Sequence, residues 1–178
     1  MKERKITEER LNGKIYPLSS KISNAHNEIR ERIVTRLAKA LEDTFYRVSN
    51  GNMRCWYHWS MDDYCVPDVM IYRKAFGQAD TDYRGVPRFL VEILSPSTIQ
   101  RDRLTKMEIY EWIMVGEYWI ISPVEKSIEI YYYKRRGYVL ENAYIFDGDK
   151  DSTEYNGDVV ISLRDFAIHM TLKEIFDT

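Results

Sequence analysis

The sequence gives little support for disulfide bonds, membrane spans or a secretory leader. Cysteine occurs only at Cys55 and Cys65, which is too few for a disulfide framework. No apolar run approaches the roughly 20 residues that cross a bilayer. The charged residues 1–5 are followed by further polar residues and not by the apolar stretch of a secretory signal. We therefore expect a soluble cytoplasmic protein with reduced thiols and no membrane partner.

The chain also lacks a large excess of charge of either sign. Its formal net charge is −2, so bulk electrostatics gives no argument for nucleic-acid binding, and only a local basic patch could serve that purpose. A zinc site is weakly supported. Cys55, His58 and Cys65 are conceivable ligands, but a structural site needs a fourth ligand and usually paired close spacings.

What is present is the composition of one globular domain. The chain has 178 residues, of which 44% are hydrophobic, and this is enough for one well-filled core and short for two. No repeat or low-complexity linker marks a boundary. We expect a single domain over residues 1–178.

The first half of the chain predicts one helix followed by strands. Apolar residues at spacings of three and four predict an amphipathic helix over about 22–41, which Ser20 or Ser23 could cap. Residues 45–72 are rich in aromatic and β-branched types, interrupted at 49–52, so two or three strands are expected to meet at a tight turn. The last of them spans 66–72 and opens at Pro67.

The second half predicts alternating strands and helices. The nearly continuous apolar stretch 88–94 indicates a central strand covered on both faces. Ser97 and Gln100 form a capping-box pattern for a helix that ends near Gly116. A buried strand over 117–122, a hairpin of 127–134 with 138–145 and a short helix over 171–176 follow. This order predicts an α/β (α+β) fold with a mixed sheet flanked by helices.

Two carboxylates stand in strands among apolar residues. Asp68 follows Pro67, and Glu92 lies inside the predicted central strand, where an ionised group is costly unless it is paired or binds a metal. Mg²⁺ is commonly held by one or two carboxylates plus waters and substrate phosphate. Asp68 and Glu92 could supply these ligands from adjacent strands, and the backbone carbonyl of Ile93 could add a third oxygen.

A lysine on the following helix completes a hydrolytic set. At 100° per residue, Lys106 falls on the edge of the apolar stripe that contains Met107 and Tyr110, so its ammonium would reach toward the strands. A lysine beside a metal-bound water can orient that water and neutralise charge growing on a phosphorane-like transition state.

Each residue also has a purely structural interpretation. Asp68 could be a turn residue, since Pro-Asp is a common turn dipeptide. Glu92 could pair with Arg88 or Arg101, and Lys106 could be a solvated lysine. His26 lies on the same helical face as the apolar residues of the first helix, so it is a further candidate for the site or, equally, a core histidine.

Several stretches, in order and spacing, resemble the Uma2 family of restriction-endonuclease-like proteins. Tyr110 resembles a recurring tyrosine of that family, and the likeness covers nearly the whole chain. The matching stretches are residues 11–16 with His26, 65–69, 83–87, 91–98, 101–106, 116–120 and 172–176.

This resemblance implies the PD-(D/E)XK nuclease fold and hydrolysis of DNA phosphodiester bonds with Mg²⁺ or Mn²⁺. Asp68 matches the aspartate of the motif, and Glu92 matches its second acidic residue. Leu94 occupies the position where the wider superfamily has its lysine. In this family the lysine is taken to have migrated to the following helix, where Lys106 lies.

Two other functional interpretations remain open. One is a catalytically silent nucleic-acid-binding or assembly protein that keeps the nuclease fold, which the near-neutral charge and displaced lysine favour. The other is a hydrolase for a different phosphoester, which would need a closed pocket. If the chain cuts duplex DNA, a homodimer is the simplest arrangement, with Tyr131 and Tyr133 as candidate interface residues.

Overall fold

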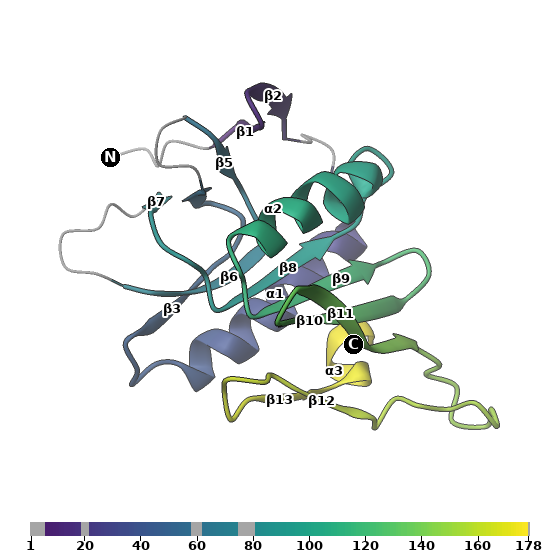
Figure 1. Ribbon diagram of the computed structural model, residues 1–178. Coiled ribbons are helices and arrows are strands. Elements are labelled where there is room, and N and C mark those ends of the chain that lie inside the picture. Colours follow the sequence, from purple (N-terminus) through teal and green to yellow (C-terminus); the bar gives the residue numbers. More distant parts are fainter. Residues whose placement is uncertain (1–5, 19–21, 58–61, 75–80, 178) are drawn as a thin grey trace.

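The computed structural model of the chain describes residues 6–18, 22–57, 62–74 and 81–177, and its centre is a six-stranded sheet (Figure 1). The strand order is β11-β10-β9-β8-β6-β3, with β8 and β9 parallel and the other neighbouring pairs antiparallel. The predicted mixed sheet is therefore confirmed. The strands are β3 (Tyr46–Ser49), β6 (Val69–Arg73), β8 (Phe89–Ile93), β9 (Glu117–Ser122), β10 (Ser127–Lys134) and β11 (Gly137–Ile145).

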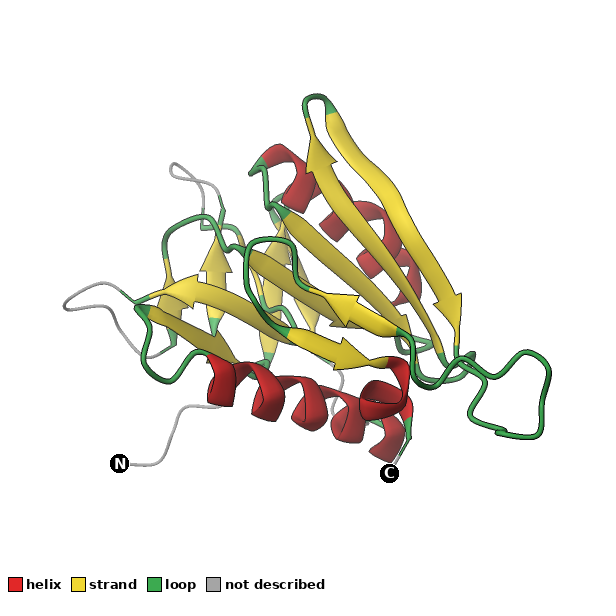
Figure 2. Cartoon of the chain, turned by 90° about the horizontal axis from the view of Figure 1, so that it is seen from below, coloured by secondary structure: helices red, strands yellow, loops and turns green. Residues whose placement is uncertain are grey.

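Helices cover both faces of this sheet (Figure 2). α1 (Asn24–Ala40) and α3 (Leu172–Phe176) lie on one face, and α2 (Met107–Trp112) lies on the other. α1 buries Ile29, Ile33 and Leu37 against the sheet because their spacing places them in one stripe. Ser23 caps α1 by accepting a hydrogen bond from the backbone N–H of His26, while Ser20 lies outside the described residues.

A second sheet packs beside α2 on the same face of the central sheet. Its order is β2-β1-β5-β4-β7, and it shares a hydrophobic core with α2 that includes Leu11, Cys55, Cys65 and Leu90. This sheet brings the N-terminal hairpin β1–β2 close to the central strands. Its strands are β1 (Glu8–Leu11), β2 (Lys14–Pro17), β4 (Arg54–Trp56), β5 (Tyr64–Cys65) and β7 (Asp82–Tyr83).

Strands β3 and β4 flank the interruption at residues 49–52 as predicted, but they do not pair with each other as a hairpin. β3 pairs with β6 in the central sheet, whereas β4 belongs to the second sheet. Gly51 has φ +81°, and a Cβ on it would lie 3.3 Å from Nη1 of Arg30 and 3.7 Å from the carbonyl oxygen of Asp68. Glycine therefore suits this position, where the chain leaves the central sheet and passes close to Arg30 and Asp68.

The helix after β8 begins differently from its prediction. Ser95 opens the first turn, since its carbonyl accepts from the N–H groups of Thr98 and Ile99, and Pro96 occupies the first-turn position that proline favours. The capping box at Ser97 and Gln100 is therefore wrong. The chain then forms a π-helix, η1 (Arg101–Lys106), before α2.

The end of α2 also differs. Met114 and not Gly116 takes the left-handed conformation that stops the helix, with φ 59°. The N–H of Val115 then donates to the carbonyl of Tyr110 at 3.0 Å, which satisfies one of the last helical carbonyls.

The remaining predicted elements agree with the structure, but the β1–β2 hairpin and an additional hairpin near the C-terminus were not predicted. β8 is interior, β9 and β10 span the expected residues, and Thr171 caps α3 in a capping box with Glu174. The additional hairpin consists of β12 (Val160–Ser162) and β13 (His169–Thr171). No described helix is long and apolar enough to cross a membrane.

Candidate active site

The predicted carboxylates meet at one end of the central sheet. Asp68 directly precedes β6, Glu92 lies on β8, and the antiparallel register that pairs Val69 with Val91 places the two residues on neighbouring chain segments. Both line a cavity of about 80 Å³. His26, Ile93 and Lys106 line the same cavity, so the structure brings all the sequence-predicted site residues together.

Asp68 is held in the ionised form by donors from two elements. Its Oδ2 accepts a hydrogen bond from the backbone N–H of Ile93 at 2.8 Å and lies 3.3 Å from Nε2 of His26. Burial alone would raise the pKa of Asp68, but the His26 and Ile93 contacts and the charge of Lys106 outweigh it, and the pKa is lowered. An ionised carboxylate facing a cavity is suited to cation binding.

Glu92 occupies a drier position. It is 2% exposed, and its two oxygens accept from Nζ of Lys106 at 3.0 Å and from the hydroxyl of Tyr110 at 2.6 Å. Burial raises the pKa of Glu92 well above its ordinary value, against the opposing charge of Lys106 and with help from nearby carboxylates such as Asp102. The structural alternatives for Glu92, Arg88 and Arg101, are not its partners.

Lys106 is the charge centre of the site. Its ammonium lies 3.2 Å from Oε2 of Glu9, 3.0 Å from Oε2 of Glu92 and 3.4 Å from Oδ1 of Asp102. Burial would lower the pKa of Lys106, but these carboxylates and Asp68 raise it well above its ordinary value. Lys106 is 3% exposed, so the alternative of a solvated lysine is wrong.

Sequence reasoning missed Glu9, which holds this side of the site in place. Glu9 is 0% exposed, its Oε1 lies 2.9 Å from Nε of Arg101, and its Oε2 accepts from the backbone N–H of Val66 at 3.2 Å. In the sequence Glu9 lies in a charged segment. The only indication that its side chain is buried is its position two residues before the apolar Leu11, on the same face of a strand. The pairing of β1 with β5 creates the contact, and no local pattern encodes it.

The π-helical turn brings in a second carboxylate that the sequence did not suggest. Asp102 is 2% exposed, and burial raises its pKa against the charge of Lys106. Arg103, on the same turn, points elsewhere and forms a bidentate pair with Glu129 at 2.9 and 2.6 Å. Arg103 therefore does not face the cavity, while Arg101 does line it.

His26 combines both roles that the sequence left open. It is 5% exposed and is packed on the sheet side of α1, yet its Nε2 contacts Asp68. Its Nδ1 is buried and has no hydrogen-bond partner in the described part of the chain. α1 therefore contributes a polar group to the cavity.

The donor set fits a hard cation that needs few protein ligands. Among the described residues, no group of three or more His, Cys, Asp or Glu is placed to hold a metal ion. Mg²⁺ needs only one or two carboxylates because waters and substrate phosphate complete its shell. Asp68 and Glu92 at one cavity meet this requirement. Cys55 and Cys65 are buried free thiols, and His58 lies outside the described residues.

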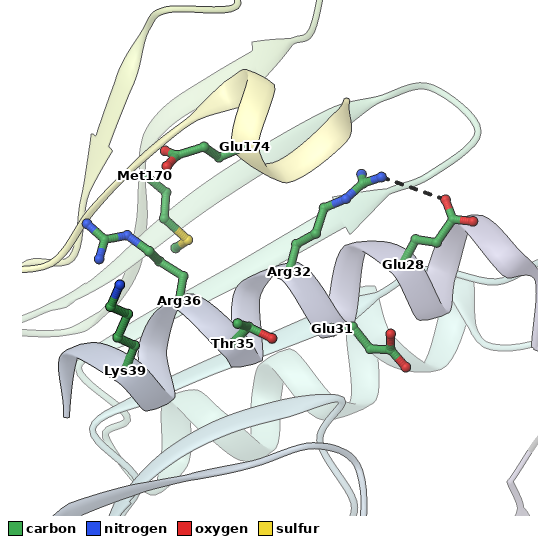
Figure 3. A pocket seen from close by; sticks show the side chains of 8 residues that line it. All are labelled: Glu28, Glu31, Arg32, Thr35, Arg36, Lys39, Met170 and Glu174. Atoms are coloured by element: carbon green, nitrogen blue, oxygen red, sulfur yellow. Dashed lines mark ion pairs between the residues drawn. The ribbon is translucent and has the colours of Figure 1, made fainter. Parts of the chain in front are cut away.

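A larger groove lies away from this site, over the outer surface of α1 (Figure 3). It has a volume of about 580 Å³, with α3 forming its other wall. Its charges largely neutralise one another, as in the ion pair of Arg32 with Glu28 at 3.8 Å. It contains no group that the chemistry above requires.

The mixed sheet is covered by helices on both faces, and the carboxylates of Asp68 and Glu92 lie together at one of its ends. This arrangement places the molecule in the class of nuclease-fold proteins. The chain belongs to the Uma2 family, described as "Putative restriction endonuclease", whose family model matches residues 2–161.

The chain is similar to a curated relative and to solved structures, of which one is described below. The relative is "Uncharacterized protein slr1290" of Synechocystis sp. (strain ATCC 27184 / PCC 6803 / Kazusa), which is 26% identical over 125 residues. That alignment covers 70% of this chain and 65% of the relative, so the match spans slightly less than two thirds of the relative's length. The solved structure is described as a putative nuclease belonging to DUF820 from Anabaena variabilis ATCC 29413. It has a TM-score of 0.72 at 20% identity, covering 95% of this chain and 89% of that one, and it supports the fold.

Proposed function

We propose that the chain is an endonuclease that hydrolyses DNA phosphodiester bonds with Mg²⁺ or Mn²⁺ as cofactor. The observation that carries the proposal is the cavity at which Asp68 lies beside Glu92 while Glu92 is bound to Lys106. A buried ion cluster of this kind is costly to assemble for stability alone. Strongly shifted pKa values beside a cavity are typical of functional sites.

In this proposal Asp68 and Glu92 would hold the cation, and the carbonyl of Ile93 would add a third oxygen. When bound, the ion would polarise the phosphoryl oxygen and lower the pKa of an attacking water. His26 keeps Asp68 oriented and ionised through the 3.3 Å contact. Tyr110 orients Glu92 through its hydroxyl.

Lys106 would stabilise the charge that develops on the phosphate. Its raised pKa keeps it positive at neutral pH, and its three carboxylate contacts fix its position before substrate arrives. A preorganised charge needs no reorganisation during the reaction, which is why such groups contribute strongly to rate.

The local basic patch that DNA binding requires has two candidates at the cavity. Arg30 and Arg101 both line it, from α1 and from η1. Arg30 is oriented by the side-chain oxygen of Asn27 at 2.8 Å, and Arg101 by Glu9. Guanidinium groups match phosphate geometry, so these residues would position the strand.

A silent binding or assembly protein is the second candidate function. It is favoured by one observation, namely that both oxygens of Glu92 are already engaged by Lys106 and Tyr110. The two candidates differ in whether DNA is cut when Mg²⁺ or Mn²⁺ is present.

Cleavage of supercoiled plasmid DNA would test the proposal. We expect nicking and linearisation with Mg²⁺ or Mn²⁺, none with a chelator and none for Asp68→Asn. The matched control, Asp149→Asn, changes an exposed loop aspartate and should cut like the parent. If DNA is bound but remains intact under all conditions, the silent alternative replaces the proposal. Equal cutting by Asp68→Asn would indicate a contaminating nuclease.

A further inference from the structure

A second cavity, of about 340 Å³, lies at the opposite end of the central sheet from the candidate active site. Arg73 ends β6 and Arg88 precedes β8, whereas Asp68 and Glu92 are at the other ends of these strands. At about 3.3 Å per residue, Arg88 and Glu92 are roughly 13 Å apart along β8. The second cavity is therefore separate from the acidic cluster.

The cavity is lined by two arginines and no carboxylate among the described residues. Arg73 and Arg88 are exposed, and neither forms an ion pair with another described side chain. The nearby carboxylate of Asp165 approaches Gly116 but does not line the cavity. Two guanidinium groups without an ion-pair partner among the described residues favour an anion at this cavity, and a phosphate carrying two charges would match them.

The remaining walls are apolar and open to solvent. Val86 is 51% exposed and Met114 is 60% exposed, and the ring of Tyr46 lies on the β3 side. An inorganic anion would need no such walls, and the volume lies in the range of small-molecule sites. A ligand that fits both the arginine side and the apolar side of this cavity carries an apolar ring system together with an anionic group.

The backbone conformation of Met114 independently indicates that the apolar walls of this cavity serve ligand binding. Its φ of 59° ends α2 in the left-handed conformation, where glycine is normally favoured. Glycine there would relieve backbone strain but would remove the side chain from the cavity. A residue that is unfavourable for the backbone is thus found where its side chain lines the cavity.

We propose that this cavity binds a nucleotide, with Arg73 and Arg88 on the phosphate and Val86, Met114 and Tyr46 against the base. The nucleotide could be a free nucleoside monophosphate or the 5′-phosphorylated end of a DNA strand. Neither source requires catalysis at the acidic cluster, so the inference is independent of the proposed function.

Titration calorimetry of the full chain, with a chelator to exclude metal-bridged binding, would test the inference. The probes are adenosine monophosphate, adenosine, inorganic phosphate and a short duplex with or without a 5′-phosphate. We expect a dissociation constant below about 0.1 mM for the nucleotide or for the phosphorylated duplex end, and much weaker binding of adenosine or phosphate alone. The tighter probe identifies the source.

Arg73→Gln and Arg88→Gln should each weaken binding about tenfold or more. Arg136→Gln, in the exposed β10–β11 turn, is the matched control and should bind like the parent. Met114→Gly should weaken binding while raising thermal stability, so its loss of affinity would not reflect misfolding.

Three results would overturn the inference. They are the absence of binding by either phosphorylated probe, equal binding of adenosine and its monophosphate, and unchanged affinity in both Arg73→Gln and Arg88→Gln.

Discussion

Asp68, Glu92 and Lys106 could be placed together from the sequence because each is unusual for its position. Two carboxylates in apolar strands and a lysine on the edge of an apolar stripe need partners, and that need is visible locally. Glu9 and Asp102 could not be found this way. Their contacts with Lys106 depend on the β1–β5 pairing and on the helical register of η1, which only the tertiary structure fixes.

Replacement of Lys106 by methionine should separate cation binding from cleavage. Removing a positive charge cannot weaken cation binding electrostatically, so Mn²⁺ affinity in calorimetry should be retained or raised. Cleavage should fall by about 10²–10³, the typical cost of losing one positioned electrostatic donor. Cleavage at the parent rate would show that the lysine has no catalytic role.

The same variant should also show how much Lys106 stabilises the buried carboxylates around it. Glu9, Glu92 and Asp102 would lose their shared counter-charge, which for a broken buried pair costs about 3–5 kcal/mol. Burial would then favour the protonated forms of Glu92 and Asp102 more strongly, so urea unfolding should show the loss growing as pH rises. A loss that does not depend on pH would argue against the cluster.

Glu9→Gln tests whether Glu9 positions Lys106. Burial opposes the charge of Lys106, and Glu9 is the strongest of the carboxylates that raise its pKa. The variant should therefore lose the basic side of the pH–rate profile at a lower pH than the parent, with a rate lower by about tenfold, as for other supporting residues. Glu129→Gln, on the Arg103 pair outside the cavity, is the control. A lower rate with an unshifted profile would mean that Glu9 is only structural.

At the scale of elements, long segments with periodic apolar residues were predictable, whereas the π-helical turn and the exact helix end were not. α1, β8, β9 and the β10–β11 hairpin follow from apolar spacing that their burial enforces. The π-helical turn η1 gives no signal in the sequence, because its spacing reflects what Asp102 and Lys106 contact on other elements. The helix end at Met114 was missed because glycine is the usual residue there.

Glu117 on β9 should make the stability of the fold depend on pH. It is 3% exposed and accepts from the indole of Trp119 and the backbone N–H of Arg164. Burial raises its pKa to about 7 from 4.5, so the folded state retains a proton that the unfolded state has lost between these values. This contribution to stability is complete below about pH 4.5 and falls by up to about 3 kcal/mol as pH rises to about 7.

Comparison with Glu117→Gln isolates this effect from other titrating groups. Urea denaturation should show that the unfolding free energy of the variant increases relative to that of the parent as pH rises from 5 to 7.5. A difference that stays constant over this range would contradict the assignment.

At the scale of the whole molecule, the fold class was predictable and the second sheet was not. The strands of that sheet are two to four residues long, which is too short for a periodic pattern. Yet this sheet carries Glu9 to Lys106, so the part of the fold that the sequence concealed completes the site. The family resemblance supplied the architecture that periodicity alone left open.

The homodimer stays a prediction at this scale. Both tyrosines are half-buried and pack on Tyr138, but the hydroxyl of Tyr131 already donates to Glu129, so Tyr133 is the better probe of an interface. We expect light scattering to show twice the chain mass, and Tyr133→Glu to shift the protein toward the monomer, since a charge opposes burial. A monomer at high concentration would remove the dimer without affecting the chemistry of the site.

The central claim is that the carboxylates of Asp68 and Glu92 share one divalent cation, and an anomalous-scattering map of crystals soaked in manganese tests it most directly. We predict a peak between the two side chains that is lost in Asp68→Asn crystals, with Lys106 still charged beside Glu92. A map with no peak there at saturating manganese, and with Glu92 still bound only by Lys106 and Tyr110, would contradict the metal-dependent site.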